Sequence, residues 1–196
     1  MASQPEALIL ASTSPYRKEL LSRLGLPFTT FQGTVDESGL PDETPVSLVK
    51  RLSEDKAQTA PPMEGDVLII GSDQVAVCDN RLLGKPGTPN KAFEQLRFTS
   101  GKQVVFFTGV ALWRPQRNRC SYAMTPTEVS MRDLSDAEIA AYIEADAPMQ
   151  CAGSFKWEAM GISLFRATSS SDPTALQGLP LIALCALLRD EGYRIP

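Results

Sequence analysis

The sequence predicts an α/β domain built around a mixed sheet. Apolar runs of strand length alternate with helical patterns along the whole chain, which is typical of α/β proteins. Two long strand-like stretches in the middle, Val104–Trp113 and Ser121–Arg132, are joined around Pro115 and favour a mixed rather than a purely parallel sheet. The length of 196 residues suits one domain, or one domain with two lobes around a cleft. We therefore expect a single domain over residues 1–196.

The first strand and helix are predicted by Leu8–Leu21. An apolar run ends there at hydroxyl residues and a proline, and a helical pattern follows. Ser14 is placed to cap the helix, and Pro15 suits its first position because the missing N–H has no partner there. Gly25 is expected to end this helix, and Phe28–Gln32 to form a strand.

Three further helix starts carry clear signals. Thr44-Pro45 and Thr88-Pro89 each combine a capping hydroxyl with a proline. The first of these helices is expected to end at Pro61-Pro62, and the second near Gly101. Ser135–Glu138 reads as a capping box and predicts a fourth helix.

The remaining elements are predicted by shorter patterns. Val67–Gly71 is a continuous apolar run, which suits a strand buried on both faces. Val75–Cys78 and Leu82-Leu83 predict a hairpin, and Gly161–Phe165 predicts a short strand. Gly178-Leu179-Pro180 is expected to start the last helix.

The composition excludes several classes of function. The formal charge is −4 and no basic tail is present, which argues against non-specific binding to nucleic acid. Without histidine, Ser-His-Asp and Cys-His catalysis and histidine metal ligands are ruled out. The four cysteines form no C-x-x-C pair, and an apolar run such as Leu179–Leu188 is too short to span a membrane. With no signal-peptide pattern at the N-terminus, we expect a cytoplasmic protein without a membrane partner.

The first helix start is also a candidate anion site. Free N–H groups at a helix N-terminus attract phosphate, and Ser12, Ser14 and Arg17 lie within one strand–helix turn. A lone arginine here would more often be a solvated helix residue. Three suitable groups together favour phosphate binding.

Acidic residues supply a second candidate region. Asp73 follows a buried run, where open α/β sheets place their chemistry, and Glu37 lies in a polar loop beside Asp36. Carboxylate oxygens suit hard divalent cations. The alternatives are a turn residue for Asp73 and a solvated loop carboxylate for Glu37.

Two lysines and one loop complete the candidate site. Lys56 and Lys85 could each place a point charge on a phosphate, although Lys56 near a helix end is also expected for dipole reasons. In Ala152–Glu158, Gly153 and Ser154 suggest a loop near a ligand. The alternation of aromatic residues in the same segment favours instead a strand with two core aromatics.

These segments resemble the Maf family of nucleotide pyrophosphatases over nearly the full length of the chain. The matching pieces, in order, are Leu10–Leu21, Val35–Glu37, Lys56-Ala57, Ile70–Gln74, Gly84–Pro86, Ser100-Gly101, Thr108-Gly109, Cys151–Gly153 and Gly178–Pro180. The resemblance implies a two-lobed Maf/ITPase-like fold, with a mixed central sheet flanked by helices and the active site in the cleft between the lobes.

The resemblance also implies a reaction and the residues that perform it. A nucleoside triphosphate would be hydrolysed to the monophosphate and diphosphate with a divalent cation such as Mg, Mn or Co. Asp73 matches the family's catalytic aspartate, whether as base or as metal ligand, and Glu37 matches a metal ligand. The phosphate- and metal-handling positions match Ser12, Arg17, Glu37, Lys56 and Lys85, and the helix-start pattern described above adds Ser14 to the expected phosphate-binding set.

Three positions resemble the subgroup that acts on 7-methyl-GTP. They are Tyr16, where that subgroup more often has tryptophan, Gln74 and Glu158. Methylation at N7 makes guanine cationic, and a cationic ring gains about 0.5–2 kcal/mol over an aromatic face such as that of Tyr16. The carboxylate of Glu158 accepts hydrogen bonds only, which suits the donor edge of guanine.

Two other functions stay open at this point. One is a Maf pyrophosphatase acting on dTTP, UTP or CTP. The other is a non-catalytic regulator of septum formation, which the complete set of charged residues makes the weaker reading. The expected partner is a small nucleotide, and a homodimer is compatible with an α/β domain of this size.

Overall fold

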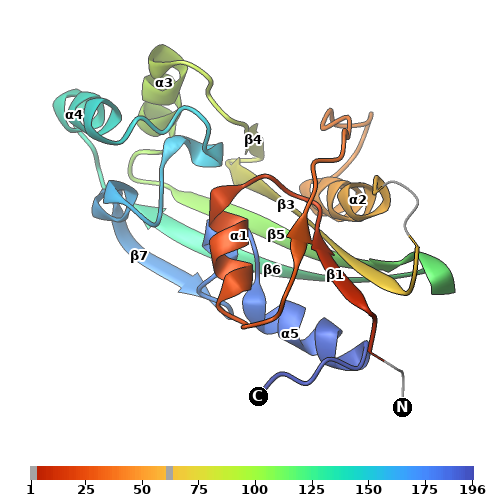
Figure 1. Cartoon of the computed structure of the whole chain (residues 1–196). Helices are drawn as coiled ribbons and strands as arrows, with labels where there is room; N and C mark the ends of the chain where they lie inside the picture. The colour runs from red at the N-terminus through yellow and green to blue at the C-terminus, as the bar shows by residue number, and fades with distance from the viewer. Residues whose placement is uncertain (1–3, 61–63) are drawn as a thin grey trace. The chain divides into compact units, whose positions relative to one another are not determined.

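The computed structural model describes residues 4–60 and 64–196 (Figure 1). The chain divides into two compact units. Unit 1 comprises the described residues up to Asp73 together with Thr108–Thr125 and Asp172–Pro196, and unit 2 comprises Gln74–Phe107 and Pro126–Ser171. The strand order in the sheet is β2-β1-β3-β5-β6-β7, and β4 pairs with β3.

The strands are β1 Ala7–Leu10, β2 Thr29–Thr30, β3 Val67–Cys78, β4 Arg81–Leu83, β5 Gln103–Arg114, β6 Arg119–Met131 and β7 Phe165–Ser170. The α-helices are α1 Pro15–Ser22, α2 Pro45–Gln58, α3 Pro89–Thr99, α4 Asp136–Asp146 and α5 Leu181–Asp190. Short 3₁₀ turns cover η1 Pro115–Arg117, η2 Ala152–Ser154, η3 Met160–Leu164 and η4 Ala175–Gln177.

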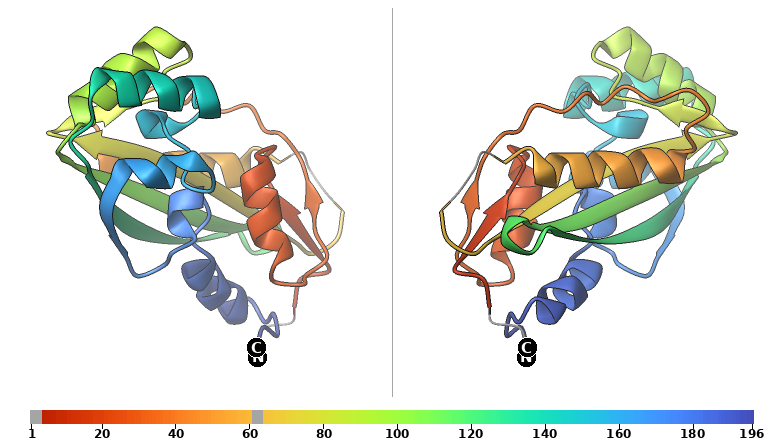
Figure 2. Two further views of the ribbon diagram at one scale, coloured as in Figure 1. Left: turned by 90° about the vertical axis from the view of Figure 1, so that its left-hand side faces the viewer. Right: turned by 90° about the vertical axis from the view of Figure 1, so that its right-hand side faces the viewer.

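Unit 1 is a layered α/β structure. β1 pairs in parallel with β2 and with the start of β3, in the register Leu10↔Thr30 and Leu10↔Ile70. Leu20 and Leu184, from α1 and α5, pack with apolar residues on one face of these strands. α2 covers the opposite face, and the two views of Figure 2 show α1 and α5 in front in one and α2 in front in the other.

Two glycines let α2 approach the sheet closely. A Cβ atom at Gly71 would lie 2.2 Å from the backbone oxygen of Ser53 and 2.5 Å from the backbone nitrogen of Ala57. A Cβ atom at Gly109 would lie 2.5 Å from Ser53 Oγ. Because no side chain fits at these positions, the backbone of α2 lies almost directly on β3 and β5.

Unit 2 contains two strand pairings and two packed helices. β4 pairs antiparallel with β3 through a two-residue turn at Asp79 and Asn80, both at positive φ, as a type I′ hairpin turn requires. β7 pairs antiparallel with β6, and α3 packs against α4. The predicted capping box of α4 is present, with Ser135 and Glu138 each accepting from the other's backbone N–H.

Most predicted elements are confirmed, and the differences concern the ends and the continuity of single elements. β3 is one continuous strand where the sequence predicts two. α1 ends at Ser22 with Arg23 as its C-cap, so the prediction that Gly25 ends it is wrong. The end of α2 predicted at Pro61-Pro62 lies outside the described residues; the helix stops at Gln58.

The strand predicted at Gly161–Phe165 is also wrong. The segment forms η3, and β7 begins only at Phe165. The N–H of Gly161 donates to the carbonyl of Lys156 at 3.0 Å, and a Cβ atom at Gly161 would lie 2.3 Å from that oxygen. The chain therefore folds back on itself here, which an extended strand does not allow.

The substitution Gly71→Ala tests the close approach of α2. The added methyl group meets backbone atoms that cannot move away singly, so we expect the free energy of unfolding to fall by about 1–3 kcal/mol. Denaturant unfolding followed by circular dichroism measures it. Gly84→Ala is the matched control, because a Cβ atom there meets nothing within 4 Å and should change stability by less than about 0.5 kcal/mol. Equal effects of the two substitutions would contradict the packing argument.

Candidate active site

The predicted anion site lies at the start of α1 in unit 1. Ser14 caps the helix, and its Oγ accepts from the backbone N–H of Arg17 at 3.4 Å. The N–H of Ser14 donates in turn to Ser12 Oγ at 3.2 Å. The two hydroxyls and the first turn of the helix are therefore fixed together, with Pro15 at the first helical position as predicted.

The guanidinium of Arg17 is fixed by a hydrogen bond to the backbone of Gly178. Its Nε donates to the carbonyl of Gly178 at 2.8 Å, and Ser72 Oγ donates to the same carbonyl at 2.8 Å. Gly178 has φ +97, a conformation that glycine adopts without strain. Burial lowers the pKa of Arg17, while the negative charges of Asp73 and Glu37 act in the opposite direction. Arg17 thus lies within electrostatic reach of both predicted carboxylates.

Lys56 joins these two carboxylates. Its Nζ donates to Glu37 Oε1 and to Asp73 Oδ1, each at 2.6 Å. The side chains of Lys56 and Asp73 are only 15% and 10% exposed, whereas that of Glu37 is 52% exposed. The structure therefore brings together residues from the first helix turn, the loop after β2, helix α2 and strand β3. Together these residues form the unit 1 cluster: Ser12, Ser14, Arg17, Glu37, Lys56 and Asp73.

Helix α2 also fixes the backbone of Asp73. The N–H of Asp73 donates to Ser53 Oγ at 3.1 Å, and Ser53 Oγ donates to the carbonyl of Val49 at 2.7 Å. Sequence reasoning missed Ser53. A signal was available, because Val49, Ser53 and Ala57 are spaced four residues apart and form a stripe of small or apolar side chains on the buried face of the predicted helix.

A tyrosine adds a polar group near the same cluster. The hydroxyl of Tyr122 is buried and, within residues 4–60 and 64–196, has no hydrogen-bond partner. Burial, followed by the charges of Glu54 and Asp73, raises the pKa of Tyr122 to about 12. The hydroxyl is therefore protonated at neutral pH. Nothing in its sequence context identifies this residue, since it lies in an ordinary strand pattern.

The other predicted site residues lie in unit 2, apart from Tyr16, which is half-buried on α1. Gln74 is half-buried in β3 directly after Asp73. Lys85 and Glu158 are both within electrostatic reach of Cys151, whose pKa is raised by burial first and by Glu158 next, with Lys85 opposing. The structure thus brings these two charged residues into one region of unit 2.

The segment Ala152–Glu158 is not a strand, so the favoured reading of its pattern is wrong. It begins as η2 with Gly153 at φ +75, and its backbone is tied to α4 because the N–H of Lys156 donates to Tyr142 Oη at 3.0 Å. Phe155 is buried, whereas Trp157 is half-buried and stacks on Phe165 at 6.1 Å between ring centroids. Gly153 and Ser154 lie in a turn, as the loop reading predicts, and their closeness to a ligand stays a prediction.

The donor set for a metal ion is small. In the part of the chain that the structure describes, no group of three or more His, Cys, Asp or Glu side chains is arranged to hold a metal. Glu37 and Asp73 nevertheless face one common cation, the ammonium of Lys56. Mg²⁺ is commonly held by one or two carboxylates plus substrate phosphates, so the pair fits that kind of site.

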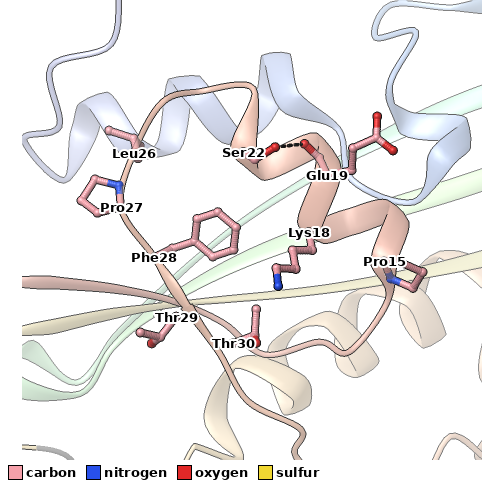
Figure 3. A pocket seen from close by; sticks show the side chains of 9 residues that line it. All are labelled: Pro15, Lys18, Glu19, Ser22, Leu26, Pro27, Phe28, Thr29 and Thr30. Carbon is pink, nitrogen blue, oxygen red and sulfur yellow. Dashed lines mark hydrogen bonds between the residues drawn. The ribbon is translucent and has the colours of Figure 1, made fainter.

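A surface pocket of about 800 Å³ lies elsewhere on unit 1. Side chains of α1 and of residues 26–30 line it, with Lys18 and Phe28 facing it from the two sides (Figure 3). None of the predicted site residues lines this pocket.

Among the described residues, no helix has the length and apolar character that a membrane span needs.

Comparison with known proteins identifies the family. The model of the family described as Maf-like protein matches residues 7–191. A 7-methyl-GTP pyrophosphatase of Pseudomonas aeruginosa is 50% identical over 189 residues, which are 96% of this chain and 98% of the relative. Proteins of the same name from Xanthomonas axonopodis pv. citri and Nitrosococcus oceani are 51% identical over 189 residues and 46% identical over 191 residues. The first of these two alignments covers 96% of this chain and 98% of the relative. The second covers 97% of this chain and 96% of the relative.

A solved structure confirms the fold class. The structure of the Staphylococcus aureus Ham1 protein matches with a TM-score of 0.53 at 12% identity, over 95% of this chain and 100% of Ham1. At that identity the likeness concerns the fold alone. The match to residues 7–191 and the near-full-length relatives lead to one conclusion: this chain belongs to the Maf family.

Proposed function

We propose that this protein hydrolyses 7-methyl-GTP to 7-methyl-GMP and diphosphate. The observation that carries the proposal is the contact of Lys56 with both Glu37 and Asp73, beside Arg17, in a chain 50% identical to a protein named for that reaction. A cluster of cations and carboxylates at a helix N-terminus suits a triphosphate, because it places positive charge on the phosphates and a proton acceptor next to them.

The basic groups bind and orient the triphosphate. The first turn of α1, with Ser12 and Ser14, offers N–H and hydroxyl donors, and Arg17 offers the outer nitrogens of its fork. Lys56 and Lys85 add point charges that stabilise the transferring and leaving phosphates. Positive charge fixed in advance is the main contribution a protein makes to phosphoryl transfer.

Asp73 acts on the attacking water. The water oxygen forms a bond to the α-phosphorus, the bond to the bridging oxygen breaks, and diphosphate leaves with that electron pair. Since the chain has no histidine, the proton passes to a carboxylate, and we assign this role to Asp73. A divalent cation, Mg, Mn or Co, would be held by Glu37 and Asp73 and would supply charge neutralisation on the phosphate oxygens.

The guanine ring of the substrate is recognised by a different set of residues. The carboxylate of Glu158 accepts hydrogen bonds from the donor edge of guanine and complements the positive charge of the methylated ring. Tyr16 offers an aromatic face to that ring, and Gln74 is the third residue of this set. That the whole chain 1–196 acts as one domain stays a prediction. A cytoplasmic location and a homodimer also stay predictions.

The substitution Asp73→Asn tests the catalytic assignment. Lys56 keeps its contact with Glu37, so the fold should persist, whereas kcat for 7-methyl-GTP should fall by at least about 10³-fold because the base is lost. Diphosphate release measures turnover and thermal unfolding checks the fold. Asp190→Asn, at the exposed end of α5, is the control and should leave kcat unchanged. A folded Asp73→Asn protein with full activity would refute the role.

Substitution of Glu158 tests the reading of the base. We expect Glu158→Gln to lower the ratio of kcat/KM for 7-methyl-GTP over GTP by about tenfold, because the attraction between the carboxylate and the positively charged methylated ring is lost, whereas GTP, whose ring is neutral, loses only the hydrogen bond that both substrates share. Glu144→Gln, an exposed glutamate on α4, should not change the ratio. Rates for dTTP, UTP and CTP belong in the same series, and a wild-type preference for one of these would favour the alternative pyrophosphatase.

Removal of divalent metal should abolish turnover. Two carboxylates and a triphosphate form a ligand set for a hard cation, so chelation is expected to stop diphosphate release, and Mg²⁺, Mn²⁺ or Co²⁺ should restore it. Full activity in excess chelator would show that the cationic side chains suffice.

A further inference from the structure

Glu37 lies in a segment without regular structure. Between the end of β2 at Thr30 and the start of α2 at Pro45, residues 31–44 form neither helix nor strand, and the side chain of Glu37 is 52% exposed. An exposed loop residue is normally free to sample many conformations, and holding one conformation costs about 1–2 kcal/mol per residue. Contacts that order the loop therefore help to keep Glu37 beside Lys56.

Arg51 of α2 contacts this loop at Glu43 and at Ser38. Its Nε donates to Glu43 Oε1 at 2.8 Å and its Nη2 to Glu43 Oε2 at 2.9 Å, which makes the pair bidentate. The same Nη2 donates to the carbonyl oxygen of Ser38 at 2.9 Å. Ser38 directly follows Glu37, so Arg51 holds the backbone next to the carboxylate-bearing residue.

Glu43 and Asp36 complete the attachment. Glu43 Oε2 also accepts from the N–H of Leu40 at 3.0 Å, and Asp36 Oδ1 accepts from the N–H of Ser38 at 2.9 Å. Hydrogen bonds from Arg51 first, and from Leu40 next, lower the pKa of Glu43 to about 2. The pair therefore stays ionised throughout the neutral range. We name Arg51, Glu43 and the Ser38 carbonyl the loop clamp.

The loop clamp is built differently from an ordinary surface ion pair. The side chains of Arg51 and Glu43 are 25% and 8% exposed, whereas those of the exposed pair Arg23 and Glu19 are 47% and 65% exposed. Exposed pairs contribute little, while a bidentate and largely buried pair restricts geometry. Arg51 also belongs to α2, the helix that carries Lys56 and lies directly on the sheet at Gly71.

We propose that Arg51 and Glu43 are positioning residues that hold Glu37 against Lys56 and Asp73. One helix then provides both the partner of the Glu37 carboxylate and the anchor of its loop. The carboxylate is placed before the substrate arrives, so substrate binding does not have to order the loop. The proposal rests on the proposed function, because it concerns the same site.

Hydrogen exchange tests the positioning directly and needs no substrate. In the Arg51→Gln protein the hydrogen-bonded amides of Ser38, Leu40 and Glu43 should exchange at least about tenfold faster than in the wild type, since the contacts that limit local opening are gone. The amides of β3 should exchange as in the wild type. Arg23→Gln is the matched control, because Arg23 lies 2.9 Å from its carboxylate partner Glu19, much as Arg51 lies 2.8 Å from Glu43. This substitution should leave the exchange of the loop amides unchanged.

Kinetics give the functional readout. Arg51→Gln and Glu43→Gln should each lower kcat/KM for 7-methyl-GTP by about 10–100-fold, the size expected for misplacement of a site group, and Arg51→Lys should recover only part of it because lysine lacks the fork. Arg23→Gln should retain the wild-type value. Where Arg51→Gln fails to fold, the milder Glu43→Gln decides.

The outcomes separate this proposal from the proposed function. Loop exchange and kcat/KM that both equal the wild-type values in folded Arg51→Gln or Glu43→Gln protein would overturn the clamp. Faster exchange with unchanged kcat/KM would also overturn it, because the loop order would then have no bearing on the site. A wild-type protein without activity on 7-methyl-GTP would instead refute the proposed function, whatever the exchange rates show.

Discussion

The arrangement of the unit 1 cluster depends on how closely α2 lies on the sheet. Gly71 and Gly109 leave no side chain between the helix and the strands, so Ser53 reaches the backbone N–H of Asp73. Lys56, further along the same helix, reaches the carboxylate of Asp73. A larger residue at Gly71 would displace the helix as a whole, and the ammonium, the anchoring hydroxyl and the arginine of the loop clamp would move with it.

Local signals predicted much of the fold. Ser14-Pro15, Thr44-Pro45 and Thr88-Pro89 each mark a helix start where the structure has one, because a capping hydroxyl and a proline act within one turn and need no distant contact. The strand predicted at Gly161 is wrong for the opposite reason. Its backbone closes on Lys156, and apolar periodicity in a short window does not report such a contact.

The candidate site was predictable as a set of residues and not as a geometry. Asp73 and Arg17 were identified by their places at a strand and a helix end, and family resemblance assigned their roles. The contact of Lys56 with two carboxylates depends on the path of an irregular loop and on the depth of a helix, neither of which leaves a periodic pattern. Ser53 and Arg51 were missed because each acts on another residue rather than on a ligand.

The acidic pair Glu37 and Asp73 carries its own counter-ion. Two negative side chains next to a buried strand would repel each other, yet the ammonium of Lys56 lies 2.6 Å from an oxygen of each. Arg17 also lies within electrostatic reach of both carboxylates, so two positive side chains of the polypeptide itself balance the two negative ones. Folding of the chain and capture of a charged ligand become separate events, since the first does not wait for an ion from solution.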